Sequence, residues 1–135
     1  MRFPALLASA TLFGGMMIYS FGLAPLVFKT LSVDEAGRML RQAFSWYYLF
    51  IVGCAVIAAA LLLAADASSA LVMAAIAIVA IYARQGLMPR INSARDQQVR
   101  GDAAASKRFA RLHGLSVILN FIQLFGAGLV LFRFS

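Results

Sequence analysis

Four long runs of uncharged, mostly apolar residues dominate this sequence, and short polar segments separate them. Of its 135 residues, 63% are hydrophobic and 13% are charged, whereas an average soluble domain is roughly 25% charged. Such runs belong in lipid, where every backbone polar group must be satisfied within its own segment, and a helix does this locally. The sequence therefore predicts an all-α integral membrane protein, a single domain over residues 1–135 that forms an antiparallel four-helix bundle.

The four expected membrane spans are about 4–28, 43–65, 69–88 and 111–132. The first is too long and too weakly basic for a typical signal peptide, so we expect it to be retained. The third is short for the ~20 residues that a span needs unless it includes 84–88, with Arg84 reaching to the interface. Pro89 should then interrupt the helix and leave 90–107 as a polar, basic connection.

Helix starts and packing positions also follow from the sequence. Ser32 and Glu35 have the spacing of a capping box, so a helix should begin there and run unbroken into the second span. Asp66 can cap the helix that follows it. Small residues on one face of the first span favour close helix packing, and a proline near its end should loosen the last turn. The expected packing residues are Gly15, Gly22 and Pro25.

The basic residues are distributed unevenly along the chain. Twelve Lys and Arg against five Asp and Glu give a net charge of +7, which in a soluble protein would raise nucleic acid as a partner. With four spans, all of these cations except Arg2 and Arg133 fall in or beside the first and third connections. The positive-inside rule then places both connections in the cytoplasm and both termini outside. We therefore expect a multi-pass membrane protein without a nucleic-acid partner.

A polar stripe runs down the fourth span. At about 100° per residue its members lie within an arc of roughly 80°, and they are His113, Ser116, Asn120 and Gln123. Asn120 lies about 10 Å deeper than His113. The four-span topology places His113 near the cytoplasmic interface of the membrane, together with three further polar side chains: Tyr47, Tyr48 and Arg84. One interpretation is that these groups only hydrogen-bond to neighbouring helices, and the other is that they mark a path or a binding site.

Few residues are suited to catalysis or to metal binding. Cys54 is the only cysteine and His113 the only histidine, so one chain has neither a His/Cys zinc site nor two histidines for haem. A second ligand would have to come from Met39, Met88 or a partner subunit, so the metal site stays unknown and no cofactor is predicted. Hydrolase motifs and Gly-rich phosphate loops are missing. We expect no catalytic residues, and basic connections that face the lipid bilayer and its anionic headgroups.

Several motifs resemble those of the transmembrane protein 205-like family, which is also described as a domain of unknown function. The most specific is the Phe-x-x-x-His-x-x-Ser-x-x-x-Asn spacing of 109–120, and the others are Gly22–Phe28, Ala36-Gly37 before Phe44 and Tyr47-Tyr48, and Met88-Pro89-Arg90-Ile91. The resemblance covers almost the whole chain. It implies a small four-span membrane protein, in bacteria one of the inner membrane, and it supplies no established reaction.

Three functional hypotheses remain open, and an enzyme is the less favoured class. The first is a transport or tolerance factor for a small solute, a metal or a toxic compound; four helices leave no wide pore, so transport would need a homo-oligomer or a rocking bundle. The second is a redox protein that binds haem or quinone at His113, with Tyr47 or Tyr48 nearby. The third is a structural or interaction subunit, in which the stripe only fixes helix packing.

Overall fold

The computed structural model describes residues 2–133, and every regular element among them is helical. The chain forms four long helical rods. They are α1 (Arg2–Ile18) continued by the π-helical η1 (Tyr19–Leu23) and α2 (Ala24–Thr30); α3 (Val33–Leu62); α4 (Ala67–Tyr82) continued by the π-helical η2 (Ala83–Leu87) and α5 (Met88–Val99); and α6 (Ala103–Arg133). The predicted all-α bundle of four long helices is confirmed.

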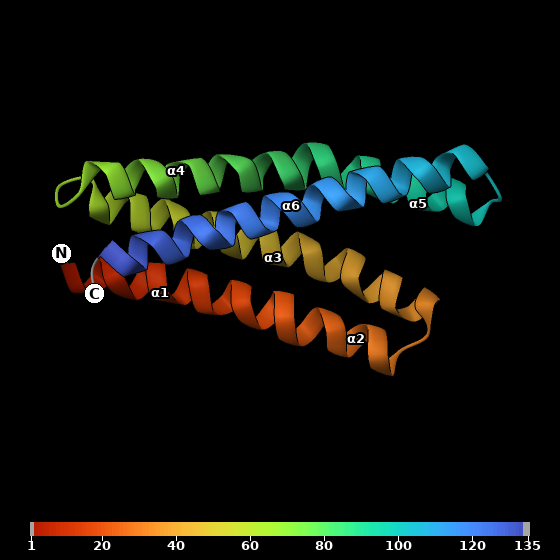
Figure 1. The fold of residues 1–135 in the computed structure, drawn as a ribbon, viewed down its shortest axis with the longest axis horizontal. Helices are drawn as coiled ribbons and strands as arrows, with labels where there is room; N and C mark the ends of the chain where they lie inside the picture. The colour runs from red at the N-terminus through yellow and green to blue at the C-terminus, as the bar shows by residue number, and fades with distance from the viewer. Residues whose placement is uncertain (1, 134–135) are drawn as a thin grey trace.

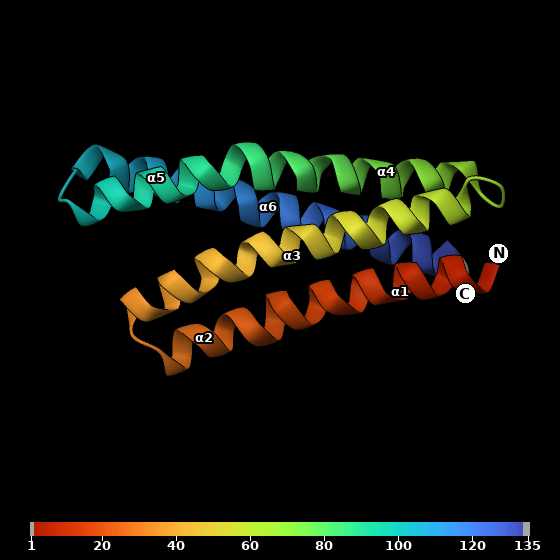
Figure 2. The same ribbon diagram turned by 180° about the vertical axis from the view of Figure 1, so that it is seen from behind.

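The rods run antiparallel, and the two ends of the bundle differ (Figure 1). Both termini and the turn between α3 and α4 lie at one end, whereas the α2–α3 and α5–α6 connections lie at the other, which we call the basic end. The rod of α3 crosses the bundle obliquely, lying beside α4 near the first end and beside α2 at the basic end (Figures 1 and 2). As a result, the α2–α3 hairpin diverges from the α5–α6 hairpin at the basic end.

The side-chain caps predicted at Ser32 and Asp66 are both present. The hydroxyl of Ser32 accepts a hydrogen bond from the Glu35 backbone N–H at 3.2 Å, and α3 then continues for 30 residues without a break. One carboxylate oxygen of Asp66 accepts the backbone N–H of Ser69 at 3.4 Å, and the other accepts the Ser69 hydroxyl at 2.6 Å. Each cap satisfies a backbone donor that has no partner inside its helix.

The prediction that Pro89 interrupts the third helix was wrong. The rod continues from α4 through η2 into α5, so the connection shrinks to Arg100–Asp102, where Gly101 adopts a φ of +93°. Met88, directly before the proline, donates its backbone N–H to the carbonyl five residues back, at Ala83. This π-helical step shifts the hydrogen-bond register ahead of the proline, which has no N–H of its own.

The loosened turn predicted near Pro25 has the same form. Ala24, directly before that proline, donates its backbone N–H to the carbonyl of Tyr19, again five residues back. The register shift lets α1 continue into α2 without a loop, so the first rod reaches Thr30. The fourth helix also extends beyond its predicted span, because α6 begins at Ala103.

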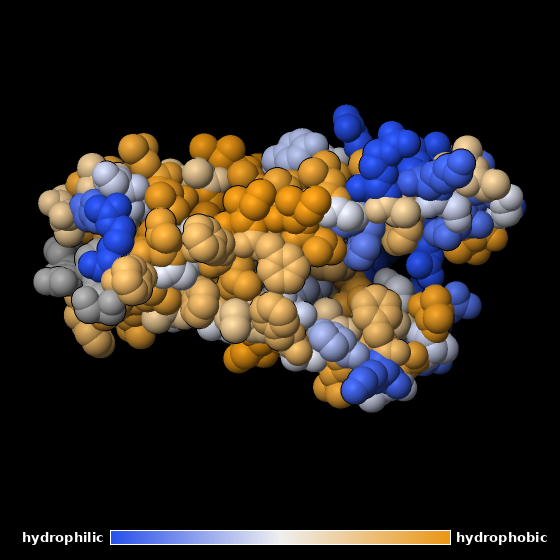
Figure 3. Space-filling view, viewed as in Figure 1, coloured by the Kyte–Doolittle hydropathy of each residue, from blue (hydrophilic) through white to orange (hydrophobic). Residues whose placement is uncertain are grey.

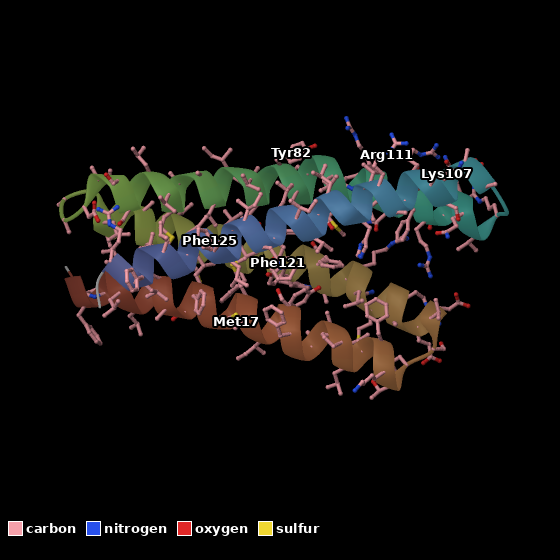
Figure 4. All side chains as sticks on the ribbon, viewed as in Figure 1. Met17, Tyr82, Lys107, Arg111, Phe121 and Phe125 are labelled. Carbon is pink, nitrogen blue, oxygen red and sulfur yellow. The ribbon has the colours of Figure 1, made fainter. Side chains whose placement is uncertain are left out.

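All four rods are long and apolar enough to cross a membrane, over Phe3–Thr30, Val33–Leu62, Ala67–Val99 and Ala103–Arg133. The face seen in Figure 3 is a broad hydrophobic belt, with most hydrophilic side chains at the basic end and a smaller hydrophilic group at the opposite end. On α6, Phe121 and Phe125 lie in the belt, while Lys107 and Arg111 lie near the basic end (Figure 4). Ile118, Ile122 and Phe125 are exposed, as expected of a face turned toward lipid. The chain is thus an integral, multi-pass membrane protein.

The three expected packing residues differ in their surroundings. A Cβ added at Gly15 would lie 2.5 Å from the Phe50 ring, so that ring of α3 packs directly against Gly15 of α1. The expectation was wrong for Gly22, which is exposed and where an added Cβ would meet nothing within 4 Å. Pro25 is exposed as well and lies in the first turn of α2. Gly22 lies within the π-helical turn η1, where the wider register changes the angular position of residues relative to α1.

Candidate functional site

A cleft of about 420 Å³ opens at the basic end, between the diverging α2–α3 and α5–α6 hairpins. Figure 3 shows the hollow between two hydrophilic lobes. We call it the basic cleft. Its apolar wall includes Phe28, Leu40, Phe44, Ile91 and Phe109, and its polar groups include Arg38, Arg41, Arg95, Asp34, Asp96 and His113. The chain thus combines aromatic and charged side chains in one concave site.

Helical spacing brings these side chains to one place. On α3 the lining residues Gly37, Arg41 and Phe44 are separated by three or four positions, and the same spacing connects Ile91 to Arg95 on α5. Residues three or four apart lie on one face of a helix. The α3 and α5 faces therefore meet across the cleft, and α6 closes it from the third side with Phe109, His113 and Ser116.

Arg41 ties α3 to α5 along the wall of the cleft. Its guanidinium donates to a carboxylate oxygen of Asp96 at 2.9 Å and to the backbone carbonyl of Asn92 at 3.0 Å. The Arg41 and Asp96 charges therefore compensate each other, and the bond to Asn92 fixes the direction of the guanidinium. This pair holds the two hairpins together at the point where they diverge.

Arg95 reaches across the cleft and pairs with no carboxylate among residues 2–133. Its guanidinium carbon lies 5.7 Å from the centre of the Phe109 ring on α6. One of its terminal nitrogens lies 3.3 Å from where a Cβ would stand on Gly37 of α3. The absence of a side chain at Gly37 therefore leaves room for the guanidinium.

The first two members of the predicted stripe belong to the cleft. His113 is exposed at the rim and stacks on Phe109, with ring centres 5.7 Å apart and planes at 6°. Ser116 is buried, and its hydroxyl donates to the backbone carbonyl of His113 at 2.8 Å. Because this bond stays within α6, Ser116 lines the cleft without tying α6 to another helix.

Asn120 enters a separate network deeper in the bundle. The Tyr47 hydroxyl on α3 donates to its side-chain oxygen at 2.6 Å, and its side-chain nitrogen donates to the Ser20 hydroxyl in η1 at 2.8 Å. Tyr47 also stacks on Tyr19, with ring centres 3.9 Å apart, and packs against Tyr48 at 5.6 Å. One asparagine thus connects the first, second and fourth rods.

Gln123 and Arg84 make contacts elsewhere in the bundle. The Gln123 side-chain nitrogen donates to the backbone carbonyl of Ile76 on α4 at 2.9 Å, while its oxygen is buried without a partner among residues 2–133. Arg84 in η2 donates to the carbonyl and hydroxyl oxygens of Ser45, at 3.3 and 3.2 Å. It lines a second, smaller pocket of about 220 Å³ on the other side of Arg41. The seven predicted residues therefore divide among four places.

Several residues of these sites were not singled out from the sequence. In the cleft they are Arg41, Asn92, Arg95 and Asp96, and in the deeper network they are Tyr19 and Ser20. Asn92, Arg95 and Asp96 all follow Pro89, so their helical spacing could be recognised only if the helix was expected to continue past that proline. Within the described part of the chain, no three His, Cys, Asp or Glu side chains gather as metal ligands.

The comparisons with known proteins reach the family and no further. No curated protein and no solved structure is significantly similar to the chain. One family model matches residues 7–100. This range includes the motif residues quoted above at 22–28, 47–48 and 88–91, but not the Phe-x-x-x-His-x-x-Ser-x-x-x-Asn spacing of 109–120. This match does not confirm the resemblance to the transmembrane protein 205-like family by that name. Since the matched residues make up more than half of its length, the chain belongs to the family described as a domain of unknown function (DUF4149).

Proposed function

We propose that this protein binds an amphipathic small solute in the basic cleft, as the entry site of a transport or tolerance function. The observation that carries the proposal is the cleft itself, a hollow of about 420 Å³ with an aromatic wall and a few charged groups. Sites for small molecules have volumes of about 300–1,000 Å³ and mostly apolar linings with a few placed polar groups. The apolar part of such a solute would contact Phe44 and Phe109, and its polar head would meet the charged side chains.

We further propose that the basic end faces the cytoplasm, in bacteria from the inner membrane, and that both termini lie outside. The Lys and Arg residues support this orientation, because they concentrate at the α2–α3 and α5–α6 connections. Short loops rich in Lys and Arg are retained on the cytoplasmic side. A solute would then enter the cleft from the cytoplasm or from the adjoining leaflet.

A binding experiment in non-ionic detergent micelles tests the proposal. The probes are dodecyl phosphate, dodecyltrimethylammonium and dodecanol, which share one chain and differ in the charge of the head. A ligand that binds only the folded state raises the unfolding temperature, Tm. We compare the native chain with Ser116→Phe, which fills the cleft, and with Ile118→Phe, a matched control on the exposed face of α6.

At least one probe should raise the Tm of the native chain and of Ile118→Phe, but not that of Ser116→Phe. If Ser116→Phe does not fold, Val99→Trp at the exposed rim of the cleft takes its place. The same Tm with and without all three probes, or equal shifts in the cleft variant and its control, would contradict a binding site in the cleft. Uptake of the bound probe into proteoliposomes then separates transport from tolerance by sequestration.

A further inference from the structure

The guanidinium of Arg95 lies in the cleft beside residues of two other helices. It comes from α5, lies over the Phe109 ring of α6 at 5.7 Å, and occupies the space that a side chain at Gly37 of α3 would fill. A long, flexible side chain loses rotamer freedom when it is fixed in this way. The arrangement therefore positions a cation across the cleft.

Within the described part of the chain, the positive charge of Arg95 has no ion-pair partner. Two other arginines of the described chain pair with carboxylates, Arg41 with Asp96 and Arg133 with Asp66. For Arg95, residues 2–133 provide the Phe109 ring but neither an ion pair nor a hydrogen bond. A cation that is partly withdrawn from water loses hydration free energy, which an anion with matching hydrogen-bond acceptors would restore.

The other charged groups that face the cleft leave its balance positive. Asp96 is already paired with Arg41. The remaining charges are Arg38 and Arg95 against Asp34, and both Arg38 and Asp34 are exposed. The imidazole of His113 lies at the rim of the cleft and stacks on the Phe109 ring that Arg95 also faces. Exposed charges are screened by water and salt, so Arg95 is the cation best placed to bind a ligand.

We infer that Arg95 is the anion receptor of the basic cleft and that the solute carries a phosphate head. The inference rests on the proposed function and names the charge of its solute. The planar guanidinium presents two parallel N–H donors to such a head. The apolar part of the solute then lies along Phe44, Leu40 and Ile91 of the cleft wall.

The test measures the affinity of the purified protein in non-ionic micelles for dodecyl phosphate, inorganic phosphate and phosphatidic acid. The three probes share the phosphate and distinguish a single-chain amphiphile, a free anion and a lipid headgroup. The variants are Arg95→Gln and Arg95→Lys, with Arg38→Gln and Asp34→Asn as controls from the same cleft. The Tm of each variant without ligand reports whether it folds.

Binding of at least one phosphate probe should weaken about 10- to 100-fold in Arg95→Gln, as expected for a lost charge-assisted hydrogen bond. Arg95→Lys should restore part of it, because lysine keeps the charge but not the planar fork. Arg38→Gln should change affinity less than about 3-fold, and Asp34→Asn should leave it equal or tighter. The probe that binds most tightly identifies the source of the anion.

Two results would overturn the inference. One is equal weakening by Arg95→Gln and Arg38→Gln, which would mean that only the general positive charge matters. The other is binding of dodecyltrimethylammonium or dodecanol in the cleft without binding of any phosphate probe, which would leave the proposed function standing and refute the anionic head. If no probe of any charge binds, both the inference and the proposed function fail.

Discussion

The hydroxyl of Tyr47 donates a hydrogen bond of 2.6 Å to the side-chain oxygen of Asn120, joining the second and fourth rods inside the apolar bundle. The same asparagine donates to Ser20 on the first rod. Polar contacts between membrane helices stabilise a bundle by about 0.6–2 kcal/mol each. The network therefore fixes how three rods pack immediately below the basic cleft.

The first prediction concerns this hydrogen bond. Tyr47→Phe and Asn120→Leu should each destabilise the protein by about 1–2 kcal/mol. Combined in a double-mutant cycle, they should show a coupling free energy of about 0.5–2 kcal/mol, measured by unfolding in mixed micelles. The control Tyr82→Phe alters an exposed tyrosine and should leave stability unchanged. Strictly additive effects of the two substitutions would mean that the bond contributes nothing to stability.

The second prediction separates two glycines on the first rod. Gly15→Ala adds a Cβ at 2.5 Å from the Phe50 ring, so the ring or the helix must shift. We expect a loss of about 1–3 kcal/mol, typical of overpacking. Gly22→Ala is the matched control, because an added Cβ there meets nothing within 4 Å, and it should be neutral or stabilising by up to about 1 kcal/mol. Equal effects at both positions in the same unfolding assay would contradict the packing described.

The third prediction concerns acid and the turn between α3 and α4. The Ser69 hydroxyl bonded to Asp66 holds the pKa of that carboxyl below its usual range, and Arg133 adds to the effect. A carboxyl whose pKa is lowered by folding stabilises the fold above its unfolded pKa of about 3.9 and loses this effect as pH falls through the folded pKa. The native Tm should therefore fall below about pH 4, whereas Asp66→Asn should remove this step and Ser69→Ala should reduce it. If Tm plotted against pH is the same for Asp66→Asn as for the native chain, the proposed contribution of Asp66 to acid sensitivity is wrong.

The fourth prediction tests the proposed orientation. In a Cys54→Ala background, Val99→Cys places a thiol at the basic end and Ser68→Cys places one in the opposite turn region. Both positions are exposed. A maleimide that cannot cross membranes should label only the Ser68→Cys variant in intact cells and both variants after the cells are opened. Labelling of the Val99→Cys variant in intact cells would contradict the proposed orientation, because it would place the basic end outside.

Local patterns predicted much of the fold. The caps at Ser32 and Asp66 and the four long helices depend on residues close together in the sequence, and the structure confirms them. Pro89 was misjudged because its effect depends on whether the backbone ahead of it can shift its hydrogen bonds, as Met88 does. The composition of a helix does not reveal this choice.

The cleft was beyond the reach of sequence patterns for a different reason. It exists because two hairpins diverge, and contacts such as Arg41 with Asp96 join residues from separate rods. Depth along the helices correctly suggested that Tyr47 lies near the polar stripe, but it did not reveal that Asn120 bonds to both Tyr47 and Ser20. Rotation of each helix about its own axis decides such pairings.

The most direct test of the central claim is photo-crosslinking with an alkyl phosphate that carries a diazirine in its chain. In non-ionic micelles, mass spectrometry should find the crosslinks on the cleft wall, at Phe44, Ile91 and Phe109. An excess of dodecyl phosphate should suppress them, and Arg95→Gln should reduce them. Crosslinks confined to the exposed face of α6, around Ile118 and Phe125, and equal in the native chain and in Arg95→Gln, would contradict a binding site in the basic cleft.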